Sequence, residues 1–524
     1  MRIALVNPNY PTFFHNKRNN VLMYNRPLQP ICLATIASML RDRHDVEIID
    51  ANVQKLSSDE LREQLASGKP DVVCVTSSPM DRWQCPFPDY SPAIEAVESA
   101  HSAAPDSFII LTGPHATSRP EEVLRQTGFV DVAVRGEPEQ TVLEIVRKLE
   151  SRSMWENVAG ISYVRKGILV SNPPRDYLQD LDELPIPAYD LLPMKKYRYE
   201  FLETKGAFSL MLTSRGCPYS CAFCYLPMYG HKFRVRSLDI VMQEIELLYR
   251  TFSVRSIYFL DLNFTFDKGR AKQLCERMIS AGYDVSWGCT TRVDAVDESL
   301  LNCMRRAGCK VISYGVETSD LQILKTIGKG ISPDEVRSVV KQTKNAGIEA
   351  DLNFLIGLPG DSAEKIESSW RFYKDLDPYS IGSTLVLPYP ETRLYEMAKG
   401  MGMVREGTWK ETADLAGLVG NDCTPKSVKK LMARQSIRAR SWYFQKEYGT
   451  YYLVNPRFVK WILGTGKRLT TDMVQALMDY LKIRKLTRAA RLRSPSDHCW
   501  PDNPHLRPSQ NESGQRPVAL EEES

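Results

Sequence analysis

Short apolar runs alternate with helical patterns twice along this chain, and this alternation limits the fold more than any other feature. In the first series, the apolar runs occupy residues 2–8, 45–50, 71–77, 108–113 and 130–134. Helical patterns lie between and after them, at 28–43, near 58–67, near 91–103, near 119–126 and at 139–150. Strands that alternate with helices form a parallel sheet with helices on its faces. The first series therefore predicts a doubly wound parallel α/β sheet.

The second series starts near residue 206 and shows the same alternation. Its apolar runs occupy residues 208–214, 256–261, 285–291, 311–317, 349–357 and 380–388. Six such βα units predict a partial (β/α) barrel. Between the two series lie a hairpin-like stretch at 160–174 and a connector rich in Pro and Asp at 173–193, which together indicate a domain boundary.

These patterns and the composition together divide the chain into five segments. We expect a first domain at 1–155, a hairpin and linker at 156–205, the barrel at 206–400, a basic helical C-terminal region at 401–493 and a disordered tail at 494–524. Residues 426–494 hold seventeen Lys and Arg against three acidic residues, interleaved with Trp442, Tyr443, Phe444 and Trp461. This excess predicts either contact with an anionic partner, such as a membrane surface, or packing against acidic surface of the protein itself.

The sequence contains no feature of a membrane or exported protein. No stretch approaches the roughly 18 uninterrupted apolar residues of a membrane span, and the first residues lack the pattern of an export signal. We therefore expect a cytoplasmic protein. In that compartment the twelve cysteines predict free thiols or metal ligands rather than disulfides.

Three cysteines, Cys217, Cys221 and Cys224, stand close together in the segment SRGCPYSCAFCY, directly after the first strand of the second series. Structural zinc usually takes two separated pairs of ligands, and here no second pair follows. Three thiolates instead suit a [4Fe–4S] cluster whose fourth iron stays open for a substrate or cofactor. The other barrel cysteines fit core positions better than a second cluster; these are Cys275, Cys289, Cys303 and Cys309.

The C-x3-C-x2-C spacing, with an aromatic residue before the last cysteine, resembles the radical S-adenosylmethionine (SAM) superfamily. The resemblance implies that the three thiolates hold the cluster and that the amino and carboxylate groups of SAM chelate its open iron. One electron from the cluster then cleaves SAM to methionine and a 5′-deoxyadenosyl radical. Arg292 would clamp the methionine carboxylate, and Ile356 and Gly357 would touch the adenine. All the implied SAM contacts lie in the cysteine loop or at strand ends: Phe223, Arg292, Gly315, Glu317, Ile356 and Gly357.

The first domain resembles the cobalamin-binding domain fused to one class of radical SAM proteins. The segments that carry this resemblance are RPLQPICLATIASML, TGPHATSRPEEVL and VRGEPEQTVLEIV, and no dinucleotide motif follows the first strand. The resemblance implies a corrin near Asn7, Thr76, Ser77, Gly113 and Gly136. The D-x-H-x-x-G motif that supplies a lower histidine ligand is absent, so we expect cobalamin with no histidine on the cobalt. His15 is interpreted as a loop residue, and a swing of His15 or His115 onto the cobalt is the competing hypothesis.

The resembling class includes cobalamin-dependent methyltransferases and the anaerobic magnesium-protoporphyrin ester cyclase. We therefore expect an enzyme in which one SAM generates a radical on an unactivated carbon and methylcobalamin donates the methyl group. Radical cyclisation, oxidation or C–C coupling on the same architecture is the alternative. Methylthiolation is disfavoured because Cys32, Cys74 and Cys85 do not supply the further cluster motif of those enzymes. A non-catalytic iron–sulfur or corrinoid-sensing module is the rival from another class.

The resemblance also implies partners. We expect a small-molecule or lipid-like substrate, with a pocket that the aromatic C-terminal region shapes, and no nucleic acid. Reduction of the cluster implies an electron donor, either a reductase or a flavodoxin or ferredoxin. Neither the motifs nor the composition name the substrate.

Overall fold

The computed structural model describes residues 1–10, 13–16, 21–24, 27–199, 202, 206–415 and isolated residues between 417 and 446. The predicted tail at 494–524 and most of the basic segment 426–494, including Phe444 and Trp461, lie outside the described residues. Among the helices of the described part, none combines the length and apolar character that a bilayer span requires.

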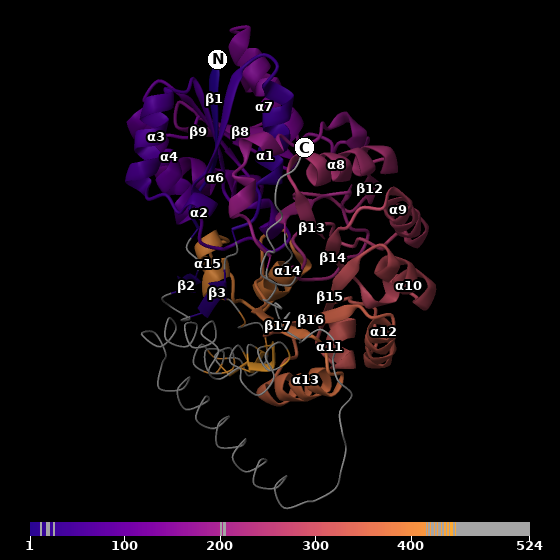
Figure 1. Ribbon diagram of the computed structural model, residues 1–524. Coiled ribbons are helices and arrows are strands. Elements are labelled where there is room, and N and C mark those ends of the chain that lie inside the picture. Colours follow the sequence, from indigo (N-terminus) through magenta and orange to yellow (C-terminus); the bar gives the residue numbers. More distant parts are fainter. Residues whose placement is uncertain are drawn as a thin grey trace, which may run out of the picture. The chain divides into compact units, whose positions relative to one another are not determined.

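The first sheet has seven strands in the order β4-β1-β5-β6-β7-β8-β9 (Figure 1). Five strands are parallel: β1 (Arg2–Asn7), β4 (Asp45–Asp50), β5 (Val72–Thr76), β6 (Phe108–Thr112) and β7 (Val132–Val134). The predicted hairpin forms β8 (Ile161–Arg165) and β9 (Ile168–Ser171), and β8 pairs antiparallel with β7. The hairpin therefore extends the first sheet at its edge.

Helices cover both faces of this sheet, as in a doubly wound fold. In Figure 1, α1 and α7 lie together on one side of the sheet, and α3 and α4 lie together on the other. Sequence signals set their ends: α3 begins with a capping box between Ser57 and Glu60, and Leu61 and Leu65 form its buried stripe. The helices are α1 (Ile31–Leu40), α2 (Ala51–Gln54), α3 (Ser58–Gly68), α4 (Ser91–Ala103), α5 (Pro114–Ser118), α6 (Pro120–Thr127) and α7 (Pro138–Glu150).

The second sheet has six strands, all parallel to their neighbours and in sequence order. They are β10 (Ala207–Met211), β13 (Val254–Phe259), β14 (Ser286–Thr291), β15 (Cys309–Glu317), β16 (Glu349–Ile356) and β17 (Ser380–Leu385). Among the described residues β10 and β17 do not pair, so the barrel is partial, as predicted. A two-stranded ladder of β11 (Ser214–Arg215) and β12 (Arg234–Val235) follows β10.

Helices α8, α9, α10, α12 and α13 line the outside of the second sheet (Figure 1). The helices of this half are α8 (Leu238–Thr251), α9 (Lys268–Ala281), α10 (Glu298–Arg306), α11 (Leu321–Thr326), α12 (Pro333–Asn345), α13 (Ala363–Asp375), α14 (Arg393–Gly400) and α15 (Trp409–Asp414). One cluster of buried apolar side chains runs through both sheets and includes Cys275, Cys289, Cys303 and Cys309. The predicted α/β class and the two successive sheets are therefore confirmed.

The structure departs from the sequence prediction between β1 and α1. The segment expected to be a loop contains a small hairpin, β2 (Phe13–Asn16) and β3 (Val21–Tyr24), so the interpretation of His15 as a loop residue is wrong. Its two runs, FFHN and VLMY, are rich in aromatic and apolar residues and flank the polar sequence KRNN. That pattern favours a hairpin, but runs of four residues are too short to stand out from a loop.

Candidate functional site

Parallel strands of the second sheet bring the expected SAM-binding residues to one edge. Arg292 follows the last residue of β14, Glu317 ends β15, and Ile356 ends β16 directly before Gly357. The cysteine loop follows β10 and β11. Because parallel strands end at the same edge of a sheet, these residues form one candidate site.

The three cysteines lie in an irregular loop whose base is closed by β11 and β12. Gly216 opens the loop with φ +83°, and a Cβ at this position would lie 2.0 Å from the carbonyl oxygen of Lys232. Only glycine fits there. Within the loop, the Ala222 N–H donates to the Ile327 carbonyl at 2.8 Å. All three cysteines are free and partly exposed, so they are accessible as ligands.

Two cations stand beside the thiols. Nη1 of Arg292 lies 3.8 Å from Sγ of Cys221, and Lys329 is buried nearby. A hydrogen bond from Cys224, helped by the charges of Lys329 and Arg292, lowers the pKa of Cys221 to about 6. The same hydrogen bond and burial raise the pKa of Cys224, and burial raises that of Cys217. Cys221 is thus a thiolate at neutral pH, the form that binds metal.

The chemistry of this donor set fits an iron–sulfur cluster better than a single metal ion. Within the described part of the chain, no three His, Cys, Asp or Glu side chains are grouped as a single-ion site requires. A cluster spreads its thiolate ligands over several iron atoms, so its ligands need not converge on one point. Lys329 and Arg292 supply positive charge that stabilises anionic sulfur.

Arg292 is held in place on several sides. Its Nε and Nη2 donate to the Asp294 carboxylate at 2.8 and 2.7 Å, and Nη2 also donates to the Lys329 carbonyl at 2.6 Å. The guanidinium lies 3.8 Å from the centre of the Tyr219 ring. The edge formed by Nε and Nη2 is therefore engaged, and Nη1 points toward Sγ of Cys221.

Glu317 forms a buried ion pair with Lys329, with Oε1 and Nζ 2.7 Å apart. Glu317 has φ +72°, a conformation that is strained for a residue with a side chain. A Cβ on Gly315 would lie 2.7 Å from Oε1 of Glu317 and 2.9 Å from Nζ of Lys329, so Gly315 leaves room for the pair. The same Nζ lies 5.8 Å from the centre of the Phe223 ring. Lys329 was not predicted, because a lysine between two glycines has no pattern that indicates burial.

The end of β16 is closed by two further contacts. Gly357 has φ +87°, its N–H donates to Asp361 at 3.0 Å, and a Cβ there would lie 2.1 Å from the Gly417 carbonyl oxygen. Burial raises the pKa of Asp361 to about 6. The chain near residue 417 therefore reaches the strand end where an adenine is expected. Sequence analysis did not assign Asp361.

The expected corrin-binding residues lie at the strand ends of the first sheet. Asn7, Thr76 and Ser77 are fully buried there, and Nδ2 of Asn7 donates to Asp50 at 2.8 Å. Gly113 has φ +101°, and a Cβ would lie 2.8 Å from Oγ of Ser77. Gly136 differs, because a Cβ there would meet no described atom within 4 Å. This edge is closely packed at Gly113 and open at Gly136.

His115, on α5, is a buried side chain with partners inside the protein. Its Nδ1 lies 3.1 Å from Oγ of Ser77, and its Nε2 lies 2.8 Å from the Phe87 carbonyl oxygen. The ring is fully buried, 4.3 Å from the centre of the Trp409 ring, and burial lowers its pKa to about 4. Both ring nitrogens are therefore engaged. Sequence analysis did not predict that Trp409, from α15, packs onto the first domain.

The described cations of the basic segment pair with acidic side chains. Arg438 and Arg434 lie 2.8 and 3.5 Å from Glu367, and Lys446 pairs with Asp377. For these residues the structure agrees with packing against the protein's own acidic surface. The remainder of the segment lies beyond the described residues.

Two protein-family models match the chain, each on one sheet. The radical SAM superfamily model matches residues 211–372, and the B12 binding domain model matches residues 21–146. The chain is 33% identical over 410 residues to the uncharacterized methyltransferase PH0819 of Pyrococcus horikoshii, covering 78% of this chain and 87% of that protein. It is 28% identical to the anaerobic magnesium-protoporphyrin IX monomethyl ester cyclase of Rubrivivax gelatinosus, covering 76% and 70%.

A solved structure has a similar fold. TsrM, a radical S-adenosylmethionine methyltransferase from Kitasatospora setae determined with cobalamin and a [4Fe–4S] cluster, matches with a TM-score of 0.61 and 19% identity. The match covers 77% of this chain and 76% of TsrM. The two sheets of this chain therefore form a known two-domain fold.

Proposed function

The chain belongs to the radical SAM superfamily as a member with a B12-binding domain, and from this premise we propose that it is a cobalamin-dependent radical SAM C-methyltransferase. The membership confirms the family resemblance and implies a [4Fe–4S] cluster, SAM and cobalamin as cofactors. The observation that carries the proposal is the site itself: three thiols, one of them a thiolate at neutral pH, lie beside two buried cations at a strand-end edge. The proposed substrate is a small molecule or lipid-like compound with an unactivated carbon.

When bound, the cluster supplies the electron that cleaves SAM, and cobalamin carries the transferred methyl group. The protein's own residues orient these groups. Cys217, Cys221 and Cys224 are the proposed cluster ligands. Nη1 of Arg292 is proposed to donate to the SAM carboxylate, and the Glu317 carboxylate, held in place by its ion pair with Lys329, to accept from its ammonium.

The other expected contacts are proposed to bind the rest of SAM and the corrin. Phe223, Gly315, Ile356 and Gly357 are proposed to shape the surface that meets the rest of SAM. The corrin is proposed to lie along Asn7, Thr76, Ser77, Gly113 and Gly136. The open space at Gly136 supports a ligand that approaches the backbone at this edge.

The methyl group must come from a second donor molecule, because a SAM that is cleaved to 5′-deoxyadenosine keeps its methyl group on methionine. We propose that this donor is another SAM. Per turnover, one substrate C–H bond becomes C–CH3, the hydrogen leaves in 5′-deoxyadenosine, and the donor SAM leaves as S-adenosylhomocysteine. The electron donor supplies the two electrons that balance this exchange. The first test is whether reduced, reconstituted protein releases 5′-deoxyadenosine from SAM. No release would favour a non-catalytic corrinoid-sensing module.

Radical cyclisation is the second candidate function, because the chain is also similar to a cyclase over most of its length. A cyclase would yield a product that has lost hydrogen and gained no methyl group. The mass of the product therefore distinguishes the two activities.

Cobalamin is proposed to bind with no histidine on the cobalt. Both ring nitrogens of His115 are engaged, which supports this proposal. We expect the electron paramagnetic resonance spectrum of the Co(II) form to show no nitrogen splitting of the cobalt lines. Splitting that is lost in His115→Ala or His15→Ala would contradict it.

We propose two partners: a flavodoxin, ferredoxin or reductase that reduces the cluster, and an anionic membrane that contacts the cations of segment 426–494 that do not pair with Glu367 or Asp377. The charge excess of that segment supports the second. Flotation with anionic vesicles at two salt concentrations tests it, and binding that does not respond to salt would count against it.

A further inference from the structure

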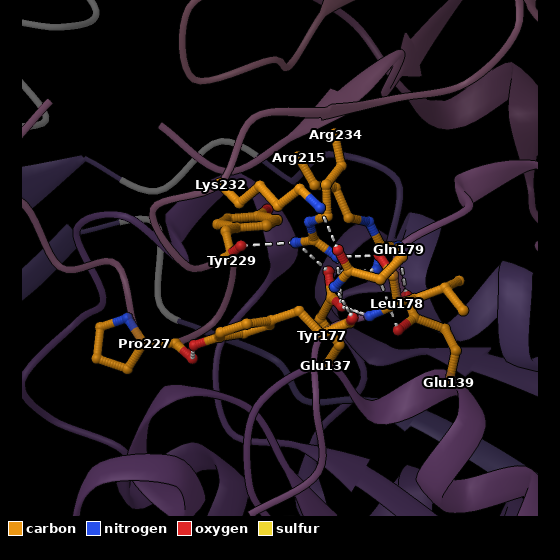
Figure 2. A network of polar contacts seen from close by, with 10 residues as sticks. All are labelled: Glu137, Glu139, Tyr177, Leu178, Gln179, Arg215, Pro227, Tyr229, Lys232 and Arg234. Atoms are coloured by element: carbon orange, nitrogen blue, oxygen red, sulfur yellow. Dashed lines mark hydrogen bonds and ion pairs between the residues drawn. The ribbon is translucent and has the colours of Figure 1, made fainter. Parts of the chain in front are cut away.

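Four buried charged side chains join the two domains (Figure 2). Glu137 and Glu139 lie at the start of α7, directly after the end of β7. Arg215 and Arg234 come from β11 and β12, and they face each other as partners in this ladder. The side chains of all four are at most 8% exposed, so water does not compensate their charges.

The four side chains interlock through paired hydrogen bonds. Arg215 donates to both oxygens of Glu139, at 2.6 and 3.3 Å, and to Glu137 at 3.1 Å. Arg234 donates to both oxygens of Glu137, each at 2.9 Å. Two positive and two negative charges therefore neutralise each other, and Glu137 bridges two arginines that would otherwise repel across the ladder.

Backbone groups extend the network into the connector. Arg234 also donates to the carbonyls of Leu178 and Tyr229, each at 2.6 Å, and the Leu178 N–H donates to Glu137 at 3.1 Å. Burial would raise the pKa of Glu137, but Arg215 and Arg234 hold it below its usual value. Glu137 therefore stays ionised, and the network stays intact at neutral pH.

The network stands between the two candidate cofactor sites. Gly136, at the open part of the corrin edge, immediately precedes Glu137, and Cys217 follows Arg215 by two residues through the constrained Gly216. β11 and β12 close the base of the cysteine loop, so the network fastens that base to the corrin edge. A shift of either side would move one site relative to the other.

Stability alone does not explain a network of this kind. Well-packed apolar side chains would stabilise a buried contact as well as ion pairs do. Paired arginine–carboxylate bonds, however, are directional, and they fix orientation where apolar contacts allow sliding.

We propose that Glu137, Glu139, Arg215 and Arg234 are positioning residues that set the distance between the cluster and the cobalt. This inference rests on the proposed function, because it requires both cofactors in one protein. It assigns to these residues no contact with SAM or substrate.

The distance can be measured by pulsed electron paramagnetic resonance between Co(II) and the reduced cluster in the full-length, reconstituted protein. Glu139→Gln keeps the shape of the side chain and removes its charge. Arg234→Lys keeps the charge and removes the fork that binds Glu137 twice. The control is Glu244→Gln, since Glu244 forms a similarly buried pair with Arg236 but bonds to no residue of the first sheet in the described contacts.

We expect a narrow distance distribution in the wild type and in Glu244→Gln, and one roughly twofold broader in Glu139→Gln and Arg234→Lys. Methyl transfer should fall about tenfold in these two variants while SAM cleavage per cluster stays near wild type, because misplacement affects only the step that joins the two sites. Iron and corrinoid contents should be unchanged.

Unchanged distributions in both network variants would overturn the proposal and leave the proposed function standing. If both network variants fail to fold, the network serves stability rather than positioning, and the proposal is also overturned. Arg234→Lys keeps the charge balance of the network, so this outcome can be measured with it. A wild-type protein that retains no corrinoid would overturn the proposed function and this inference together.

Discussion

Replacing Cys217, Cys221 or Cys224 by Ala should remove the cluster and with it all cleavage of SAM. Each change takes away one of three thiolate ligands. Losing even an outer-shell partner of a metal ligand lowers metal affinity about 10- to 100-fold. The iron content should therefore fall by at least about tenfold. All three variants should lose iron to a similar degree, because each cysteine binds the cluster as a thiolate. Iron analysis and the charge-transfer absorbance of anaerobically reconstituted protein measure the loss.

Cys303→Ala is the matched control. Cys303 is a buried thiol of the same half of the chain, and it lies among the core residues rather than at the strand ends. It should keep a full complement of iron. If Cys217→Ala, Cys221→Ala and Cys224→Ala all keep their iron and still cleave SAM, these cysteines are not the ligands.

Arg292→Ala should weaken SAM binding by roughly ten- to a hundredfold, since a hydrogen bond to a charged group contributes about 1.5–3 kcal/mol. Asp294, the Lys329 carbonyl and Tyr219 hold the guanidinium so that Nη1 faces the site. The cluster should remain, because Arg292 is not a ligand. Calorimetry with SAM on the reconstituted protein measures the change.

Arg255→Ala controls for the loss of a stacked arginine. Arg255 donates to the carbonyls of Tyr249 and Val254 and lies 3.9 Å from the centre of the Tyr249 ring, but it stands near the amino end of β13, away from the site. SAM affinity should not change in this variant. Equal affinity in Arg292→Ala and the wild type would remove Arg292 from the proposed SAM contacts.

The sequence predicted the strand ends well because most parallel strands of these sheets are mainly apolar runs that stop near a polar residue or glycine. Arg292 and Gly357 each follow such a run directly. A parallel sheet then places all these ends at one edge, whatever the detailed packing. The edge of the site could therefore be derived without coordinates.

The partners across the site could not be derived in this way. Arg215 and Glu139 are 76 positions apart, and Lys329 is 12 positions from Glu317, so no local periodicity relates them. Their pairing depends on where two domains and a loop meet. The hairpin of β2 and β3 was missed for a different reason, since its strands are too short to show a pattern.

Labelled product tests most directly whether this protein transfers a methyl group to carbon. Cells with and without the gene are grown anaerobically on methionine with a deuterated methyl group, and their small molecules and lipids are compared by mass spectrometry. We predict a gene-dependent compound that carries an intact CD3 group in place of one hydrogen of its precursor. A gene-dependent compound that has lost hydrogen and carries no CD3 group would contradict methyl transfer and favour cyclisation.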